Sequence, residues 1–152
     1  INWGILLMYG GAIVIATSLT RTGAAEWLSQ TIFEILPQST FIMLVVIIII
    51  TKFLTEGVSN VASVAVILPV AFSAAEAYSL NPIMLTLSVA LSGGLAFLLP
   101  MGTPPNAIAF SSGYLEISEV VKLGLVLNVI SIIFIYLVSK FYWPLVGLKL
   151  IL

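Results

Sequence analysis

Residues 40–75 read TFIMLVVIIIITKFLTEGVSNVASVAVILPVAFSAA and hold two apolar arms, residues 40–54 and 61–75, around a polar tip, residues 55–60. A helix needs about 20 apolar residues to cross a bilayer, and neither arm reaches that length. Non-helical backbone survives at membrane depth only where it is buried in protein or lines a water-filled cavity. The stretch therefore predicts a re-entrant helical hairpin whose tip ends inside the membrane.

The composition of the whole chain indicates an all-α integral membrane protein. Of its 152 residues, 61% are hydrophobic and 7% are charged, whereas a soluble domain has about 25% charged residues. The net charge of −1 provides no electrostatic footprint for nucleic acid. The chain has no Cys, His or Asp, and it lacks the Ser/His pair, paired acidic residues or metal cluster of an enzyme. We expect a multi-pass protein of the cell membrane that uses no organic cofactor.

Four further segments complete a single membrane domain over residues 1–152. Residues 3–20 and 122–143 are long and apolar enough to cross the membrane. Residues 21–38 mix acidic and apolar side chains, which predicts an amphipathic helix at the interface with Trp27 as an anchor. Residues 83–99 form an apolar helix that begins after Asn-Pro.

A second interruption follows that last apolar run. Residues 100–106 read PMGTPPN, and a short apolar piece, residues 107–110, comes after them. This pattern predicts a discontinuous helix with an unwound elbow between its halves. Two interrupted elements in one membrane chain are the sequence pointer to a transporter binding site.

Each break would expose helix ends that suit ions. The last carbonyls of one half-helix carry partial negative charge, and the first N–H groups of the next carry partial positive charge. At the hairpin tip, Ser59 and Asn60 are favoured N-cap residues, so we expect the second arm to start at Val61 with its N–H groups facing an anion. Thr55 and Val58 would offer carbonyls to Na⁺, and a hard cation prefers oxygen ligands of this kind.

The elbow repeats this arrangement. Thr103 is a predicted N-cap, and Pro104 suits the first helical position, where no N–H is needed. Gly102 permits tight backbone geometry. Residues 103–106 could therefore present a second helix N-terminus to an anion.

Structural interpretations compete with these functional ones. A lone Ser-Asn pair signals nothing, and Pro-Pro can be only a kink, but the two breaks together favour a binding site. Lys52 and Glu56 are four residues apart and could pair on one helix face. Charges at membrane depth are functional candidates, but we favour a structural ion pair that holds the tip against the rest of the protein.

At these residues the chain resembles the divalent anion/sodium symporter family, which includes dicarboxylate, citrate and sulfate transporters. Residues 2–11, NWGILLMYGG, look like the family's Trp-Gly…Gly-Gly segment. Residues 55–61, TEGVSNV, are similar to its second Ser-Asn-Thr hairpin tip. Residues 99–107, LPMGTPPNA, resemble its Thr-Pro-Pro-Asn-Ala elbow. Order and spacing agree over essentially the whole chain.

The resemblance implies half of an inverted-repeat transporter that works as a homodimer by an elevator-like displacement. This chain resembles the C-terminal repeat, so the N-terminal half, with the first hairpin and first sodium site, is expected upstream of Ile1. The sodium ligands that the resemblance implies are Thr55, Val58, Ser59, Asn60 and Gly102. The substrate-binding residues that it implies are Ser59, Asn60 and Pro104, and the predicted substrate site also includes Val61 and Thr103. Val61 departs from the family, which typically has Thr at this position, and this puts the exact substrate in doubt.

The sequence thus predicts a secondary active transporter that couples Na⁺ to the symport of small divalent anions, such as succinate or sulfate. Membrane lipid would surround it. Sodium is expected to bind first, because neither break contains a cationic side chain. Two alternatives stay open. One is an exporter of arsenite or a Na⁺/H⁺ exchanger of the wider ion-transporter superfamily. The other is a non-transporting membrane scaffold subunit, in which Ser59, Asn60 and Thr103 would tolerate Ala.

Overall fold

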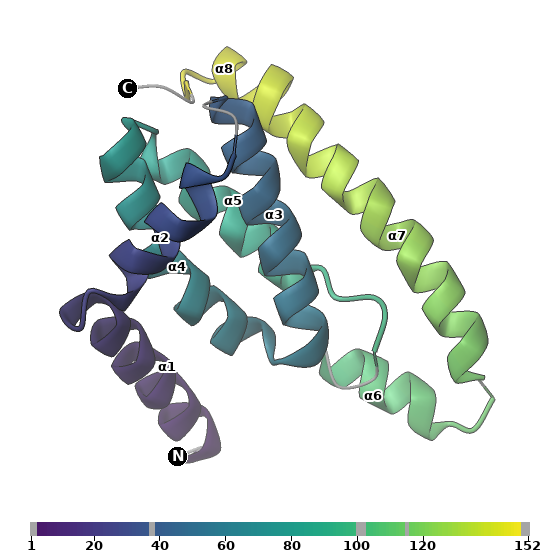
Figure 1. Ribbon diagram of the computed structural model, residues 1–152. Coiled ribbons are helices and arrows are strands. Elements are labelled where there is room, and N and C mark those ends of the chain that lie inside the picture. The colour runs from purple at the N-terminus through teal and green to yellow at the C-terminus, as the bar shows by residue number, and fades with distance from the viewer. Residues whose placement is uncertain (1–2, 37–38, 100–102, 115, 150–152) are drawn as a thin grey trace.

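The computed structural model describes residues 3–36, 39–99, 103–114 and 116–149, and these contain helices and no strand. The predicted all-α class is confirmed. In chain order the elements are α1 (Trp3–Arg21), α2 (Ala24–Glu34), α3 (Thr40–Gly57), α4 (Asn60–Tyr78), α5 (Pro82–Gly94), α6 (Pro104–Ser111), α7 (Ile117–Leu137), a π-helical turn η1 (Val138–Tyr142) and α8 (Trp143–Leu145) (Figure 1).

Helices α3, α4 and α5 pack together and form the centre of the molecule. Their shared core is apolar and includes Leu44, Ile48, Ala71, Ala74, Met84, Leu85 and Val89. Helices α1 and α2 pack against α4, while α7 runs along the side of α3 (Figure 1). The core therefore holds together the two hairpin arms and the first half of the interrupted helix.

Three helical stretches among the described residues are long and apolar enough to cross a membrane: Thr40–Gly57, Asn60–Ala77 and Ile117–Leu145. The first two are the hairpin arms. Helix α3 has 18 residues and α4 has 19, so the prediction that each arm is too short to cross is wrong. Helix α3 continues through Lys52, Thr55 and Glu56 because each of these polar side chains has a hydrogen-bond partner.

The first half of the interrupted helix ends earlier than predicted. Helix α5 stops at Gly94, and residues 95–99 form a non-helical connection. Two adjacent glycines, Gly93 and Gly94, lower the helix propensity here. Helix α6 begins at Pro104, so an interruption is present as predicted, and it starts earlier in the chain than expected.

Helix α2 has the predicted amphipathic character over a shorter range than residues 21–38. Ala25, Ser29 and Phe33 are buried, whereas Trp27 is 64% exposed. This pattern places one face of α2 on the protein and leaves Trp27 on the outside.

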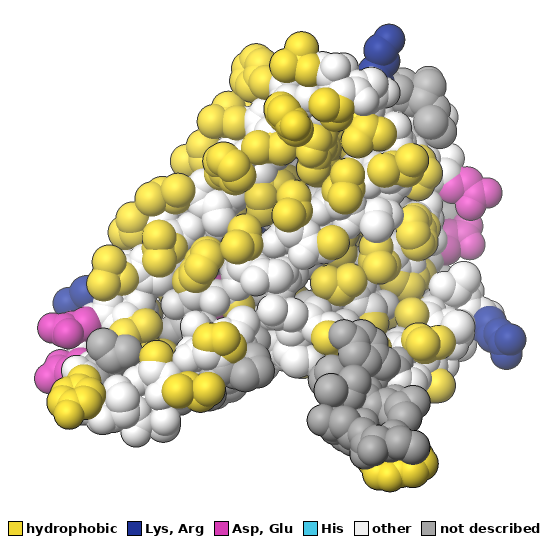
Figure 2. All heavy atoms as spheres, turned by 180° about the vertical axis from the view of Figure 1, so that it is seen from behind, with side chains coloured by type: hydrophobic (Ala, Val, Ile, Leu, Met, Phe, Trp, Pro, Cys, Tyr) yellow, Lys and Arg dark blue, Asp and Glu magenta, His cyan; other side chains and the backbone are white. Residues whose placement is uncertain are grey.

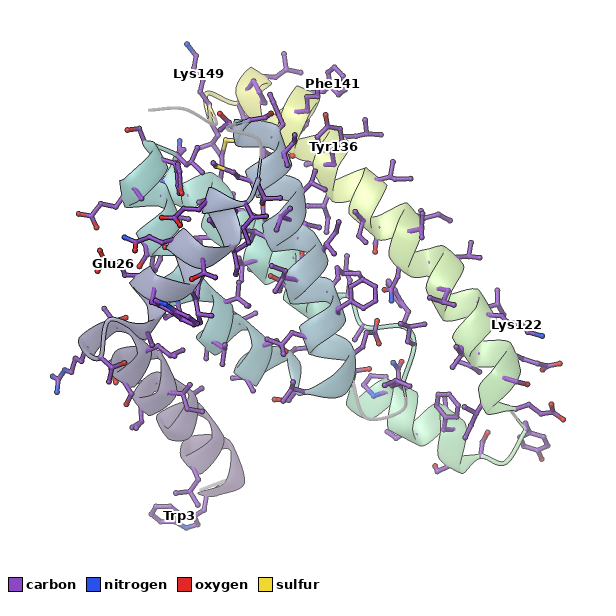
Figure 3. The ribbon with its side chains drawn as sticks, viewed as in Figure 1. Trp3, Glu26, Lys122, Tyr136, Phe141 and Lys149 are labelled. Atoms are coloured by element: carbon purple, nitrogen blue, oxygen red, sulfur yellow. The ribbon has the colours of Figure 1, made fainter. Side chains whose placement is uncertain are left out.

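The outer surface is apolar between charged margins. Figure 2 shows hydrophobic side chains over most of one face, with the charged side chains near its edges. Lys122 and Lys149 lie near opposite ends of α7, where Figure 3 shows them pointing outward. Lys52 and Glu56 are the two charged side chains that are buried among the described residues. This distribution suits a helix bundle surrounded by lipid, whose ends reach water.

Candidate functional site

The hairpin tip is a two-residue turn between α3 and α4. The N–H of Val58 donates to the carbonyl of Leu54 over 3.0 Å and closes α3. The hydroxyl oxygen of Ser59 accepts from the N–H of Ala62 over 3.3 Å and caps α4. Ser59 is therefore the N-cap, as predicted, and α4 begins at Asn60, one residue before the expected start.

Three oxygen atoms from three helices meet beside this tip. The hydroxyl oxygen of Thr55 in α3 lies 2.7 Å from Oδ1 of Asn60 in α4 and 2.8 Å from the carbonyl oxygen of Gly93 in α5. A hydroxyl carries one hydrogen, so both acceptors share it. Thr55 is fully buried. This cluster, which we call the oxygen cluster, consists of neutral oxygen ligands of the kind that hard cations prefer.

Gly93 joins the oxygen cluster because α5 approaches α4 very closely. A Cβ at Gly93 would lie 2.5 Å from Cγ2 of Val64 and 3.8 Å from the carbonyl oxygen of Asn60. A side chain at this position would fit only if the side chain of Val64 shifted. Gly93 was absent from the predicted site, and the only sequence signal for it was the Gly-Gly pair at the end of an apolar run.

The connection after Gly93 is held by the buried carboxylate of Glu56. This carboxylate accepts hydrogen bonds from the backbone N–H groups of Phe97, Leu98 and Leu99 over 2.9, 2.8 and 3.4 Å. Such N–H groups would otherwise be unpaired, because this stretch has left the helix. Glu56 thus satisfies three donors of the unwound segment.

The positively charged side chain of Lys52 binds the same connection. Its ammonium donates to the carbonyl of Leu95 and lies 4.6 Å from the ring centroid of Phe97. The carbonyl end of α5 carries partial negative charge, which also favours a cation at this place. The predicted ion pair between Lys52 and Glu56 is not among the contacts of these two described residues; each side chain instead binds backbone atoms of residues 95–99, and in this way both hold the connection.

The elbow is folded back onto this connection by Asn106. Its side-chain amide donates to the carbonyls of Ala96 and Leu99 over 3.1 and 3.3 Å. Its backbone N–H donates to the hydroxyl oxygen of Thr103 over 3.4 Å, so Thr103 caps α6 as predicted. Asn106 belongs to the predicted elbow, but it is not among the predicted site residues.

The structure brings some predicted site residues together and separates others. Thr55 and Asn60 meet in the oxygen cluster. Ser59 and Thr103 act as helix caps, and Pro104 is the first residue of α6. Val58 is 42% exposed at the tip. Gly102 lies outside the described residues.

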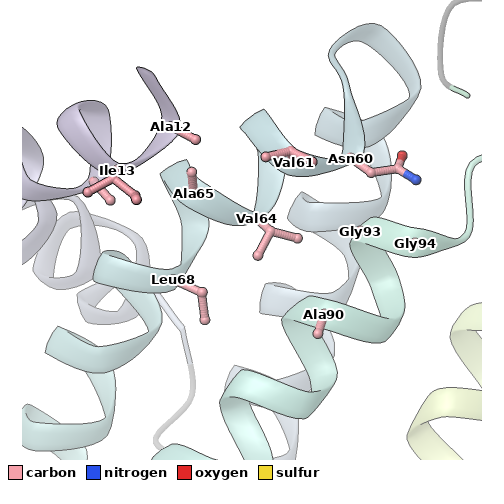
Figure 4. Close-up of a pocket in the computed structure, with 11 residues that line it drawn as sticks. Ala12, Ile13, Asn60, Val61, Val64, Ala65, Leu68, Ala90, Gly93 and Gly94 are labelled. Atoms are coloured by element: carbon pink, nitrogen blue, oxygen red, sulfur yellow. The ribbon is translucent and has the colours of Figure 1, made fainter. Parts of the chain in front are cut away.

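Val61 lines an apolar groove between α1, α4 and α5. The groove has a volume of about 420 Å³, and its lining residues include Ala12, Ile13, Val61, Ala65, Leu68 and Ala90. Figure 4 shows the side chain of Asn60 pointing away from α1, while Val61 lies on the side nearer to α1. The lining also includes the polar residue Asn60, but no charged residue, so an anion deep in the apolar part of the groove would lose its hydration with little compensation. The groove suits an apolar packing partner.

Comparison with known proteins agrees with this architecture. A family model described as the sodium:sulfate symporter transmembrane region matches residues 1–149. The chain is 36% identical over 142 residues to a sodium-dependent dicarboxylate transporter of Staphylococcus saprophyticus, covering 93% of this chain and 27% of that protein. It is also 35% identical over 143 residues to an uncharacterized transporter of Haemophilus influenzae, covering 93% of this chain and 31% of that protein.

A sodium-dependent dicarboxylate transporter of Staphylococcus aureus is 36% identical over 144 residues, which is 95% of this chain and 28% of that protein. The chain thus spans less than a third of the length of these relatives. They are transporters, not enzymes, and three apolar helices of crossing length fit a multi-pass membrane location. Since the family model covers nearly every residue, the chain belongs to the sodium:sulfate symporter family, which is the divalent anion/sodium symporter family that its motifs resemble.

Proposed function

We propose that this chain is the C-terminal repeat of a secondary active transporter that couples Na⁺ to the symport of small divalent anions. The observation that carries the proposal is the oxygen cluster, where Thr55, Asn60 and Gly93 converge beside the hairpin tip and the end of α5. The names of the staphylococcal relatives, sodium-dependent dicarboxylate transporters, support the same activity.

The coupling cation in this proposal is bound by neutral oxygen atoms. Thr55 and Asn60 would provide side-chain oxygens, and Gly93 would provide a carbonyl oxygen. The nearest carboxylate, Glu56, already accepts bonds from Phe97, Leu98 and Leu99 and from the amide of Asn128. A site without a free carboxylate favours a monovalent ion over Ca²⁺ or Mg²⁺, whose sites use carboxylates. Val58, Ser59 and Gly102 are the further sodium ligands that we propose.

The anion in this proposal binds at the N-termini of α4 and α6. Ser59 and Thr103 cap these helices, and the residues that would touch the anion are Ser59, Asn60, Val61, Thr103 and Pro104. The chain has one Arg, Arg21 at the end of α1, so no guanidinium belongs to either break. The Lys52 ammonium at the second break already donates to the carbonyl of Leu95, so sodium would bind first and supply the positive charge that the anion needs.

The membrane path and the assembly complete the proposal. Helices α3 and α4 would form a hairpin that enters and leaves from one side, since polar Thr55, Glu56 and Ser59 gather at its tip. The remaining repeat of the transporter, a second copy and membrane lipid would cover the apolar outer faces. The chain covers less than a third of these relatives, which supports the remaining repeat, whereas the second copy is proposed from the family resemblance alone.

Uptake of labelled succinate by the full-length transporter in liposomes tests the proposal. The measurement compares an inward Na⁺ gradient with K⁺ in place of Na⁺, and it includes sulfate and citrate as competitors. Uptake that requires Na⁺ supports the symporter. Uptake that ignores Na⁺ would overturn the coupling, and no uptake of any dianion would favour an exporter or a scaffold.

A further inference from the structure

Helix α7 contacts the centre of the molecule along one narrow face. The buried positions on α7 and the turn after it are Gly124, Asn128, Ser131, Ile135 and Ser139. Two of them, Gly124 and Asn128, lie one turn apart. Gly124 contacts the unwound connection, and Asn128 contacts Glu56, the carboxylate that holds this connection. The rest of α7 is largely exposed and apolar.

At Gly124 the backbone of α7 rests directly on the connection. A Cβ at Gly124 would lie 2.4 Å from the carbonyl oxygen of Phe97 and 3.0 Å from Cα of Leu98. The contact leaves no room for a Cβ atom at this position. Helix α7 therefore fixes one face of residues 97–98.

At Asn128 the same helix contacts Glu56. The side-chain amide of Asn128 donates to Oε1 of Glu56 over 2.8 Å, and the same oxygen accepts from the N–H of Phe97. Asn128 is 8% exposed, so this contact is buried. Hydrogen bonds to an ionised acceptor are roughly twice as strong as neutral ones. The carboxylate thus has four donors, three from the connection and one from α7.

The other end of the Asn128 amide has no hydrogen-bond partner among the described residues: its Oδ1 is buried and unpaired. An unpaired buried oxygen costs free energy, and an apolar residue of similar size would avoid that cost. The bond to Glu56 is the only feature of Asn128 in the described structure that offsets this cost.

The position of Glu56 affects the oxygen cluster from two sides. Glu56 directly follows Thr55 in α3, and the connection that it holds begins two residues after Gly93. A displaced carboxylate would release the connection and with it the carbonyl of Gly93. We infer that Asn128 is a positioning residue for the sodium site. Asn128 holds Glu56, and Glu56 holds the connection, so that the Gly93 carbonyl stays beside Thr55 and Asn60. This inference rests on the proposed function.

The test replaces Asn128 by Leu in the full-length transporter and measures the Na⁺ concentration for half-maximal uptake. The expected result is a rise of about tenfold, as for the loss of one bond to a charged group. Ser131→Ala is the matched control. Ser131 is buried one turn further along α7, and its hydroxyl donates to the carbonyl of Asn128 in its own helix. We expect this control to leave the Na⁺ dependence unchanged.

A second variant shows whether Asn128 acts through Glu56. In a Glu56→Gln background, Asn128→Leu should raise the half-maximal Na⁺ concentration by much less than it does alone, because the two residues share one interaction. Stabilisation of the purified protein by Na⁺ against heat, with K⁺ as the reference, provides a readout that needs no transport. If Asn128→Leu is not recovered as folded protein, Asn128→Ser is measured by the same criteria.

The outcomes separate this inference from the proposed function. An unmodified protein that shows no Na⁺ dependence in uptake or in heat stability would overturn both. Normal Na⁺ dependence in the unmodified protein, with an Asn128 variant that loses heat stability but keeps the same half-maximal Na⁺ concentration, would overturn only the inference. Equal effects of Asn128→Leu in the two backgrounds would overturn the role of Glu56 as intermediary.

Discussion

The hydroxyl oxygen of Thr55 lies 2.7 Å from Oδ1 of Asn60, although the two residues belong to different helices of the hairpin. The pair joins the last turn of α3 to the first residue of α4 at the tip. The same hydroxyl also contacts the carbonyl of Gly93, so one atom links three helices. The consequences can be tested in the full-length transporter.

Thr55→Val should raise the half-maximal Na⁺ concentration for uptake by at least about tenfold, because one oxygen ligand is lost while the shape is nearly kept. Thr51→Val is the control. Thr51 is also fully buried, one turn earlier on α3, but its hydroxyl donates to Ile47 of its own helix over 2.7 Å. Equal Na⁺ dependence in the two variants would rule out the oxygen cluster as a cation site.

Gly93→Ala should lower both the thermal stability and the Na⁺ affinity. The new Cβ would meet Cγ2 of Val64 at 2.5 Å, and overpacking of this kind costs about 1–3 kcal/mol. Heat unfolding in detergent measures the first effect, and a Na⁺ titration of uptake measures the second.

Two companion variants make the Gly93 result specific. Gly94→Ala should have little effect, because nothing lies within 4 Å of a Cβ there. Adding Val64→Ala to Gly93→Ala should recover part of the lost stability, since it removes the clashing atom. No recovery in the double variant would show that a different contact causes the loss.

Glu56→Gln should destabilise the protein by about 1.5–3 kcal/mol, because the bonds from Phe97, Leu98 and Asn128 lose their charged acceptor. Heat unfolding measures the change. Glu76→Gln on α4 is the control, since Glu76 is exposed. A Glu56→Gln protein as stable as the unmodified one would show that the neutral amide serves the connection equally well.

Val61→Thr should change which dianion is preferred and leave the Na⁺ dependence unaltered. The added hydroxyl restores a hydrogen-bonding group at the start of α4, worth about 1 kcal/mol to a substrate oxygen. Competition of succinate uptake by sulfate and citrate measures the preference. Val61 lines the apolar groove, so an unchanged preference would show that this side chain faces a packing partner instead of the substrate.

The sequence by itself determined the features that depend on composition and on local chemistry. The apolar excess predicts the membrane class, and Ser59, Asn81 and Thr103 mark the helix starts at α4, α5 and α6. Capping involves residues two or three positions apart, so its signal lies within a short stretch of sequence. The interruption between α5 and α6 was predicted for the same reason, from Pro and Gly.

Only the tertiary structure decided how long the helices are and which atoms form the candidate site. The polar residues Thr55 and Glu56 predict the end of the first arm at Leu54, yet α3 continues through them because their partners come from other parts of the chain. Glu56 meets Phe97 from 41 residues away and Asn128 from 72. Thr55 meets Gly93 from 38 residues away. Contacts over such separations depend on how α3, α4, α5 and α7 pack, and no local sequence pattern encodes that packing.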